Sequence, residues 1–227
     1  MMNEAHDGLR RCRRTRVIGR RILPTARALG VRHLAMEALG PPGAWRWIRL
    51  SRFGLLPRFG NAGYLDQPEM RELIRTAIDL GFRLSGYEAD PRRAPKDIAA
   101  DTLTLVYTNW REERQAANLA DLLTSLPADD KLLVWCGNGH LYKGATGEWV
   151  PMGVHFGRLT GVEAFALDQT VTVAWGHPDQ VGPRLLELTR EQLRARGGTA
   201  GFLREAGPLS FLSGSDAHLP SLENALD

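Results

Sequence analysis

A glutamate and a histidine stand two residues apart near the start of the chain, at Glu4 and His6. An imidazole has an ordinary pKa of about 6.5, so His6 could remove a proton from water near neutral pH. Three further ionisable residues, Glu37, Glu88 and His140, each follow an apolar stretch. The carboxylates could orient a water molecule or the imidazole, and His140 could hold the water or protonate a leaving group. These residue types suit hydrolysis by an activated water, and they could also bind a divalent metal ion.

Short apolar runs alternate with longer amphipathic stretches along the chain. The runs predict strands at 31–38, 82–87, 132–136, 164–167 and 171–175, and the stretches predict helices at 9–29, 66–80, about 109–124 and 181–196. This alternation is typical of an α/β fold with a mainly parallel central sheet and helices on both faces. Ligands of such sheets bind at the carboxyl ends of the strands. We therefore expect the ionisable side chains that follow the runs to converge on one edge of the sheet.

The start of the chain predicts a truncated first strand. A Glu-x-His motif at the sheet edge should follow a strand, yet only three residues precede Glu4. We expect that most of this strand lies upstream of Met1. No repeat and no low-complexity linker divides the chain, so residues 1–227 are expected to form a single α/β domain.

Two segments depart from the alternation. Residues 39–65 are rich in glycine, proline and aromatic side chains, among them Trp45. A connection of this length indicates either a lid that contacts substrate or a loop that packs its aromatic rings on the sheet edge. Residues 176–227 are expected to supply a carboxyl-terminal helix and a closing strand or tail.

The charge of the chain is concentrated at its start. Lysine and arginine total 29 against 26 acidic residues, a net charge of +3. Residues 1–32 hold nine arginines against two acidic residues, so this segment carries +7 and the remainder −4. Most of these arginines form the solvated face of the first predicted helix. Arg16 lies at the edge of the apolar face, where a guanidinium requires a carboxylate or a substrate anion as partner. Arg16 is therefore a candidate for stabilising an oxyanion.

Composition excludes several classes of protein. A hydrophobic content of 43% and a charged content of 24% indicate a folded chain. Two cysteines form neither a disulfide framework nor a zinc motif. Apolar runs of about five residues predict no membrane span, and the arginine-rich start resembles no secretory signal, so a cytoplasmic location is expected. The basic helix lacks interleaved aromatics, and so nucleic acid is not an expected partner.

Several short motifs occur in the order found in one superfamily. The stretch Asn3–Asp7 resembles the amino-terminal Gly-Glu-x-His motif of the erythromycin esterase-like, haem-uptake and Tiki-type superfamily. Ala35-Met36-Glu37 resembles its second-strand glutamate. Arg111–Asn118 is similar to its Arg-Asp-x-x-Met-Ala-Glu-Asn helix. Leu133–His140 resembles its strand ending in histidine, and Met152–His155 its Met-Gly-x-x segment. The resemblance covers about residues 3–175.

The esterase branch of this superfamily implies metal-independent cleavage of an ester-like bond in a small molecule, with no cofactor. Under this hypothesis the side chains that act on the reacting atoms are His6, Glu4, Glu37, His140 and Arg16. Those expected to contact substrate are Glu88, Arg111, His155 and Trp45, although Arg111 could instead pair with a site carboxylate.

Departures from the family pattern keep other functions open. Asn3 replaces the usual glycine, and the long helical insert of the macrolide esterases is absent. The haem-uptake branch implies iron or haem binding without turnover, and the Tiki-type branch implies metal-dependent hydrolysis. In those cases His6, Glu37 and His140 would be the metal ligands. A non-catalytic module that binds a partner through its arginine-rich helix is a third alternative, and no signal in the sequence specifies an oligomeric state.

Overall fold

The computed structural model describes residues 1–4, 9–44, 62–65, 67–169, 199–202 and 209–213. Within these residues a seven-stranded sheet has the order β3-β2-β4-β1-β5-β7-β6. The strands are β1 (Met2–Asn3), β2 (Val31–Met36), β3 (Arg83–Gly86), β4 (Lys131–Cys136), β5 (Leu167–Asp168), β6 (Thr199–Phe202) and β7 (Leu209–Ser213). All neighbouring strands are parallel except β6 and β7, which are antiparallel.

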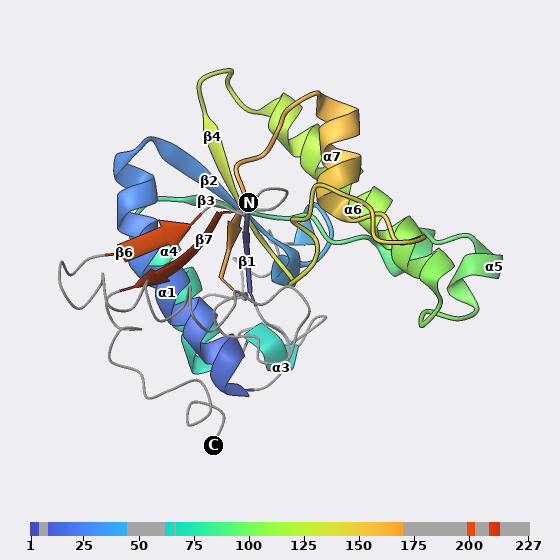
Figure 1. Cartoon of the computed structure of the whole chain (residues 1–227), viewed down its shortest axis with the longest axis horizontal. Helices are drawn as coiled ribbons and strands as arrows, with labels where there is room; N and C mark the ends of the chain where they lie inside the picture. The colour runs from blue at the N-terminus through green and yellow to red at the C-terminus, as the bar shows by residue number, and fades with distance from the viewer. Residues whose placement is uncertain (5–8, 45–61, 66, 170–198, 203–208, 214–227) are drawn as a thin grey trace.

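Helices cover both faces of this sheet (Figure 1). On one side lie α1 (Leu9–Ala28) and α4 (Pro68–Asp79), and on the other α6 (Leu105–Ser125) and α7 (Met152–Thr160). The remaining elements are short: η1 (Glu37–Leu39), α3 (Ala62–Leu65), η2 (Pro91–Arg93) and α5 (Lys96–Ala99). The predicted α/β fold, with a mainly parallel sheet between two helical layers, is confirmed.

Two hydrophobic cores follow from the alternation of side chains along the strands. Leu34 and Met36 of β2 face α1 and α4, whereas Ala35 between them faces α6 and α7. In β4 the same alternation sends Trp135 to the first core and Val134 to the second. The sheet is therefore buried on both faces, which explains why its strands are uninterrupted apolar runs.

Most predicted boundaries shift by a few residues. The run at 31–38 ends as a strand at Met36 because Glu37 begins the turn η1, and the helix expected from 109 begins at Leu105. The fourth run, 164–167, contributes only its last residue to β5. Helix α7 is absent from the sequence-based prediction because nine residues with two glycines gave too weak a helical pattern. The strand at 171–175, the helix at 181–196 and the centre of the candidate lid lie outside the described residues.

The beginning and end of the chain both contribute strands. β1 comprises Met2 and Asn3 and lies between β4 and β5, in the interior of the sheet. Toward the other end, β7 pairs with β5 in parallel and β6 pairs with β7, so this region contributes two strands where a single closing strand or tail was predicted.

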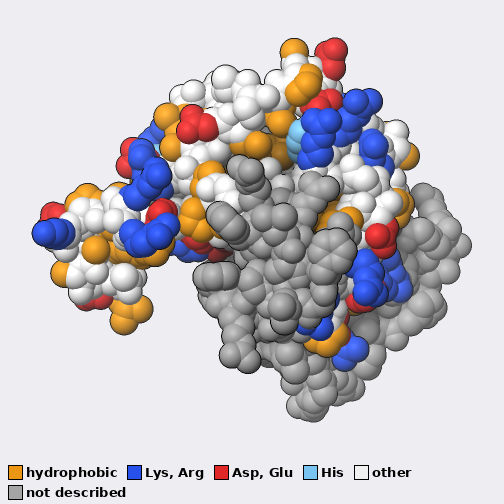
Figure 2. Space-filling model, turned by 180° about the vertical axis from the view of Figure 1, so that it is seen from behind, with side chains coloured by type: hydrophobic (Ala, Val, Ile, Leu, Met, Phe, Trp, Pro, Cys, Tyr) orange, Lys and Arg blue, Asp and Glu red, His pale blue; other side chains and the backbone are white. Residues whose placement is uncertain are grey.

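One part of the structure projects from its body. α5 and the first turns of α6 extend away from the sheet in Figure 1, and Figure 2 shows the same projection from behind with hydrophobic side chains on its surface. Leu103 and Val106 are 94% and 61% exposed there. In the part of the chain that the structure describes, no helix has the length and apolar character needed to cross a membrane.

Close backbone contact at Gly86 brings the ends of β2 and β3 together. A Cβ atom at this position would lie 2.2 Å from the Gly40 carbonyl oxygen and 2.7 Å from that of Leu39. Two residues later, Glu88 N–H donates to the Gly40 carbonyl at 3.0 Å. Only glycine allows the turn after β2 to approach the end of β3 in this way.

We predict that Gly86→Ala destabilises the fold by about 1–3 kcal/mol, because backbone atoms must move to admit the methyl group. Urea unfolding measures the loss. The control is Gly144→Ala, since a Cβ atom at Gly144 would meet no atom within 4 Å. Equal unfolding midpoints for the two variants would contradict the predicted role of Gly86.

Candidate active site

The carboxyl edge of the sheet brings together side chains that are distant in sequence. Glu88 follows β3, Glu37 follows β2, the loop leading to His140 follows β4, and Glu4 follows β1. Because these strands are neighbours in the order β3-β2-β4-β1, their carboxyl ends lie side by side. The helices on the two faces then supply the partners of these groups.

Arg111 of α6 connects two of the carboxylates. Its Nε donates to Glu88 Oε1 at 2.9 Å, and its Nη2 donates to Glu88 Oε2 and to Glu37 Oε1. Burial alone would lower the pKa of Arg111, but hydrogen bonds and the charges of Glu88 and Glu37 raise it. Gln115, one turn farther along α6, also donates to Glu88, at 3.0 Å. Arg111 thus pairs with carboxylates, which agrees with the interpretation of this residue as an ion-pair partner.

His140 lies between two carboxylates. Its Nδ1 is 2.7 Å from Glu112 Oε2, and its Nε2 is 3.5 Å from Glu37 Oε2. The imidazole is 10% exposed. The same Glu37 oxygen accepts a hydrogen bond from Gly137 N–H at 3.0 Å, which orients this carboxylate toward the loop after β4.

The surroundings of His140 favour its protonated form. Burial alone would lower the pKa of this imidazole, but the hydrogen bond with Glu112 and the negative charges of Glu37 and Glu112 raise it above its usual value. The charge of Arg111 acts in the opposite sense and is outweighed. An imidazolium with its Nε2 side toward Glu37 can donate a proton.

Glu112 was not among the predicted site residues. Its carboxylate, 3% exposed, accepts hydrogen bonds from Trp149 Nε1 at 3.1 Å and from Met152 N–H at 2.6 Å, in addition to its contact with His140. Met152 is the first residue of α7, so the positive end of that helix faces the carboxylate. Spacing in the sequence carried a signal, since Glu112 shares one helical face with the apolar residues Ala116 and Leu119.

A second buried ion pair lies on the opposite face of the sheet. Arg16 Nε of α1 donates to Glu4 Oε2 at 2.9 Å, with the two side chains 1% and 3% exposed. Arg16 Nη1 donates to Gln67 Oε1, and its guanidinium stacks on the Tyr64 ring with the central carbon 4.4 Å from the ring centroid. Glu4 is therefore the carboxylate that the position of Arg16 required. Among the described residues, Arg16 Nη2 is buried with no hydrogen-bond partner.

The pKa of Glu4 is higher than that of an exposed glutamate. Burial raises the pKa of Glu4 to about 7, and the charge and hydrogen bond of Arg16 only partly oppose this effect. The negative charge of Glu37 adds to the increase, which indicates that the two carboxylates lie within electrostatic range of each other. Glu4 can therefore gain or lose a proton near neutral pH.

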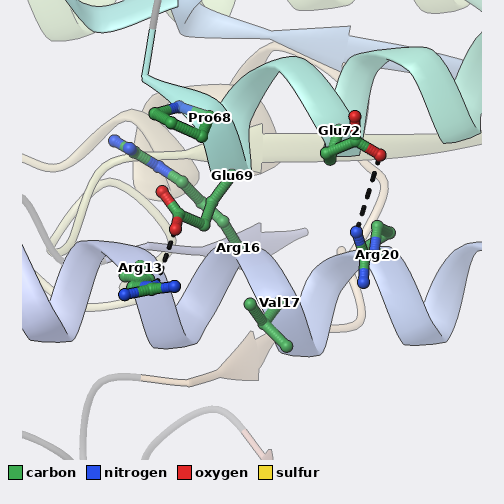
Figure 3. A pocket seen from close by; sticks show the side chains of 7 residues that line it. All are labelled: Arg13, Arg16, Val17, Arg20, Pro68, Glu69 and Glu72. Carbon is green, nitrogen blue, oxygen red and sulfur yellow. Dashed lines mark ion pairs between the residues drawn. The ribbon is translucent and has the colours of Figure 1, made fainter.

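A shallow hollow lies beside Arg16, between α1 and α4 (Figure 3). Ion pairs cross it, from Arg13 to Glu69 at 2.6 Å and from Arg20 to Glu72 at 3.7 Å. Both exposed arginines in the hollow, Arg13 and Arg20, therefore have a glutamate partner on α4.

Asn3 holds the end of β4 to β1 and β5. Its Nδ2 donates to the Asn138 carbonyl at 2.9 Å, and its Oδ1 accepts from Gln169 N–H at 2.7 Å. Asn3 is thus a buried connector between three strand ends. The sequence indicated only that Asn3 replaces the glycine of the Gly-Glu-x-His motif, and it did not predict these hydrogen bonds.

The other predicted site residues are not joined to this cluster by a described contact. His6 and Trp45 lie outside the described residues. His155 lies on α7, and its Nε2 is buried with no hydrogen-bond partner in the described part of the chain. Of the alternative metal ligands, Glu37 and His140 are adjacent, but no group of three or more histidine, cysteine, aspartate or glutamate side chains within the described residues has an arrangement that could hold a metal ion.

We predict that Glu4 makes stability depend on pH. Its carboxyl is protonated in the folded protein up to a pH of about 7, but in the unfolded chain only up to about 4.5. Unfolding therefore releases a proton between these values, and the free energy of unfolding falls as pH rises across this range, by up to about 3 kcal/mol.

Urea unfolding at about pH 5 and about pH 8 measures this fall. Glu4→Gln should make the fall smaller, because an amide does not titrate and only the part due to the raised pKa of His140 remains. Glu113→Gln, at an exposed position on α6, should retain the whole fall. The prediction is wrong if Glu4→Gln and the parent chain lose stability equally between the two pH values.

Comparisons with known proteins concern the fold alone. No family model matches the chain, and no curated protein matches it. The crystal structure of RRSP, a MARTX toxin effector domain from Vibrio vulnificus CMCP6, is 19% identical, with a TM-score of 0.44 over 74% of this chain and 32% of that one. A structure described as bacterial protein toxins is also 19% identical, with a TM-score of 0.47 over 78% of this chain and 34% of that one. The chain thus spans about a third of the length of these two structures.

Proposed function

We propose that the chain is a hydrolase of the erythromycin esterase-like type, in which an activated water attacks an ester-like bond of a small molecule. The observation that carries this proposal is the buried imidazole of His140, held between Glu112 on its Nδ1 side and Glu37 on its Nε2 side. A histidine bound in this way has a defined orientation and a defined proton to donate. Its position at the carboxyl edge of a parallel sheet is where ligands of such folds bind.

In the proposed reaction His140 is the general acid. Its Nδ1 is engaged by Glu112, so the Nε2 proton is the one available to the leaving group. The protonated state that this role requires is favoured by the two carboxylates. Glu37, 3.5 Å from Nε2, is placed to orient the attacking water beside the acid.

The remaining roles are assigned by residue type and position. His6 is the proposed base that accepts the proton of the water, since it follows Glu4 by two residues. Glu4, with its pKa of about 7, could support this transfer, and Arg16 Nη2 is a donor suited to an oxyanion if the Glu4 and Arg16 pair opens toward substrate. Arg111 and Glu88 are 30% and 21% exposed and would contact the substrate at the outer side of the cluster.

A metal-dependent or haem-binding function is the second candidate, although the described residues would supply only two of its ligands. A carboxylate on Nδ1 of a histidine is the usual support of a metal-ligating imidazole, and Glu112 occupies that place behind His140. His140 Nε2 and Glu37 Oε2 would then be two ligands of a divalent ion, with His6 as the third. Such an ion would act as a Lewis acid toward the substrate or its water.

Ester hydrolysis tests the proposal directly. We predict that the chain hydrolyses p-nitrophenyl esters and that His140→Gln lowers kcat/KM by about 100-fold or more. The matched control is His33→Gln, because His33 is also a buried histidine bound to a carboxylate, 2.8 Å from Asp130, but at the amino end of β2.

Treatment with a chelator separates the two mechanisms. Turnover that survives the chelator supports the proposed metal-independent reaction, and turnover that is lost and then restored by a divalent ion supports the alternative. A correctly folded chain that hydrolyses none of the esters would overturn the hydrolase assignment.

The pH dependence of turnover tests the role of His140. We predict that activity falls as pH rises through the pKa of this imidazole, because its proton is needed by the leaving group. Glu112→Gln removes the partner that most favours the imidazolium, so the fall should occur at lower pH. Glu113→Gln, at the adjacent exposed position, should leave the profile unchanged. Identical profiles for the Glu112 and Glu113 variants would exclude His140 as the titrating acid.

A further inference from the structure

An asparagine of α6 pairs with the backbone of the loop between β4 and α7. Asn109 Nδ2 donates to the Glu148 carbonyl at 2.8 Å, and Asn109 Oδ1 accepts from Val150 N–H at 3.0 Å. A side-chain amide that bonds a carbonyl and an N–H on either side of one residue imitates the pairing of a neighbouring strand. The residue enclosed by these two bonds is Trp149.

Trp149 is held on its other edge as well. Its backbone N–H and carbonyl pair with Thr146 at 3.2 Å and 3.0 Å, which closes a tight turn within the loop. Thr146 and Asn109 together thus bind both groups of Trp149, the Glu148 carbonyl and the Val150 N–H. The position of the Trp149 side chain is set by these bonds, because the peptide groups on both sides of it are bound.

The indole of Trp149 reaches the cluster around His140. Its Nε1 donates to Glu112 Oε1 at 3.1 Å, while the other oxygen of Glu112 lies 2.7 Å from His140 Nδ1. The ring packs over Gly139, where a Cβ atom would lie 2.4 Å from the ring. Trp149 therefore contacts Glu112, which binds His140, and Gly139, which precedes His140 in the chain.

We propose that Asn109 is a positioning residue of the site: by fixing the peptide groups beside Trp149, it keeps Glu112 and the Gly139–His140 segment in the arrangement that holds the imidazole. Asn109 and Glu112 are three residues apart on α6, so they lie on one side of that helix. One turn of α6 therefore binds the loop at two places: Asn109 binds the backbone beside Trp149, and Glu112 binds the Trp149 indole. The expected effect of Asn109 on turnover rests on the proposed function. The claim that Asn109 fixes Trp149 and Glu112 does not.

The first test compares Asn109→Ala with Thr108→Val. Thr108 Oγ1 donates to the Thr104 carbonyl within α6, so its variant also loses a side-chain hydrogen bond on the same turn without touching the loop. With p-nitrophenyl esters as substrate, Asn109→Ala should lower kcat by about 10-fold to 100-fold with little change in KM. Thr108→Val should keep the parent values.

The second test needs no turnover. The indole N–H resonance of Trp149, assigned with Trp149→Phe, reports the hydrogen bond to Glu112 in a two-dimensional nitrogen–proton spectrum. In Asn109→Ala this resonance should shift and its hydrogen exchange should accelerate, whereas Thr108→Val should leave both unchanged. If Asn109→Ala fails to fold, Asn109→Asp takes its place, because a carboxylate can still accept from Val150 N–H but cannot donate to the Glu148 carbonyl.

The outcomes distinguish the two proposals. An unchanged Trp149 resonance in the folded Asn109 variant would overturn the positioning role, whether or not esters are hydrolysed. A shifted Trp149 resonance supports the positioning role of Asn109. If the resonance shifts but the parent chain hydrolyses no ester, only the proposed reaction is overturned. A loss of kcat that Thr108→Val shares would also count against Asn109, because it would reflect general weakening of α6.

Discussion

A carboxylate removed from water must be given hydrogen-bond donors, and Glu112 shows how this requirement organises the structure. Its two oxygens receive the indole of Trp149, the first N–H of α7 and the imidazole of His140. Two of the donors belong to the loop after β4 and the third to the start of α7, so one buried carboxylate joins α6 to both. The imidazole is oriented as a consequence, since its Nδ1 side is committed to Glu112.

Glu4, on the other face of the sheet, is also a buried carboxyl that needs hydrogen-bond donors, but its donors compensate less for burial. Glu4 has Arg16 as its main partner, and burial still raises its pKa to about 7. Arg111, in contrast, is shared between Glu37 and Glu88 near the surface. A parallel sheet with helices on both faces can therefore place two kinds of ionisable group along one edge. One is a deeply buried carboxyl with a pKa near 7, and the other is a partly exposed pair of carboxylates bound to one arginine.

Elements with a strong local pattern could be predicted from the sequence. The strand ending at Cys136 and the helices α1 and α4 follow from uninterrupted apolar runs and from helical periodicity. The positions of Glu37, Glu88 and His140 after their strands follow in the same way. Helix α7 was not predictable, because its nine residues include two glycines and its stability derives from packing of Met152 and Phe156 against the core.

The sequence alone determined the fold class and the edge of the sheet at which the ionisable residues gather, since both depend on the order of apolar runs and on the polar residue that ends each run. It also determined that Arg16 needs an anionic partner. Only the tertiary structure decided which groups pair: Glu4 with Arg16, Arg111 with two glutamates, and His140 with Glu112. These pairs join residues between 12 and 74 positions apart. Pairing at such separations depends on side-chain direction and burial, which spacing along the chain does not specify.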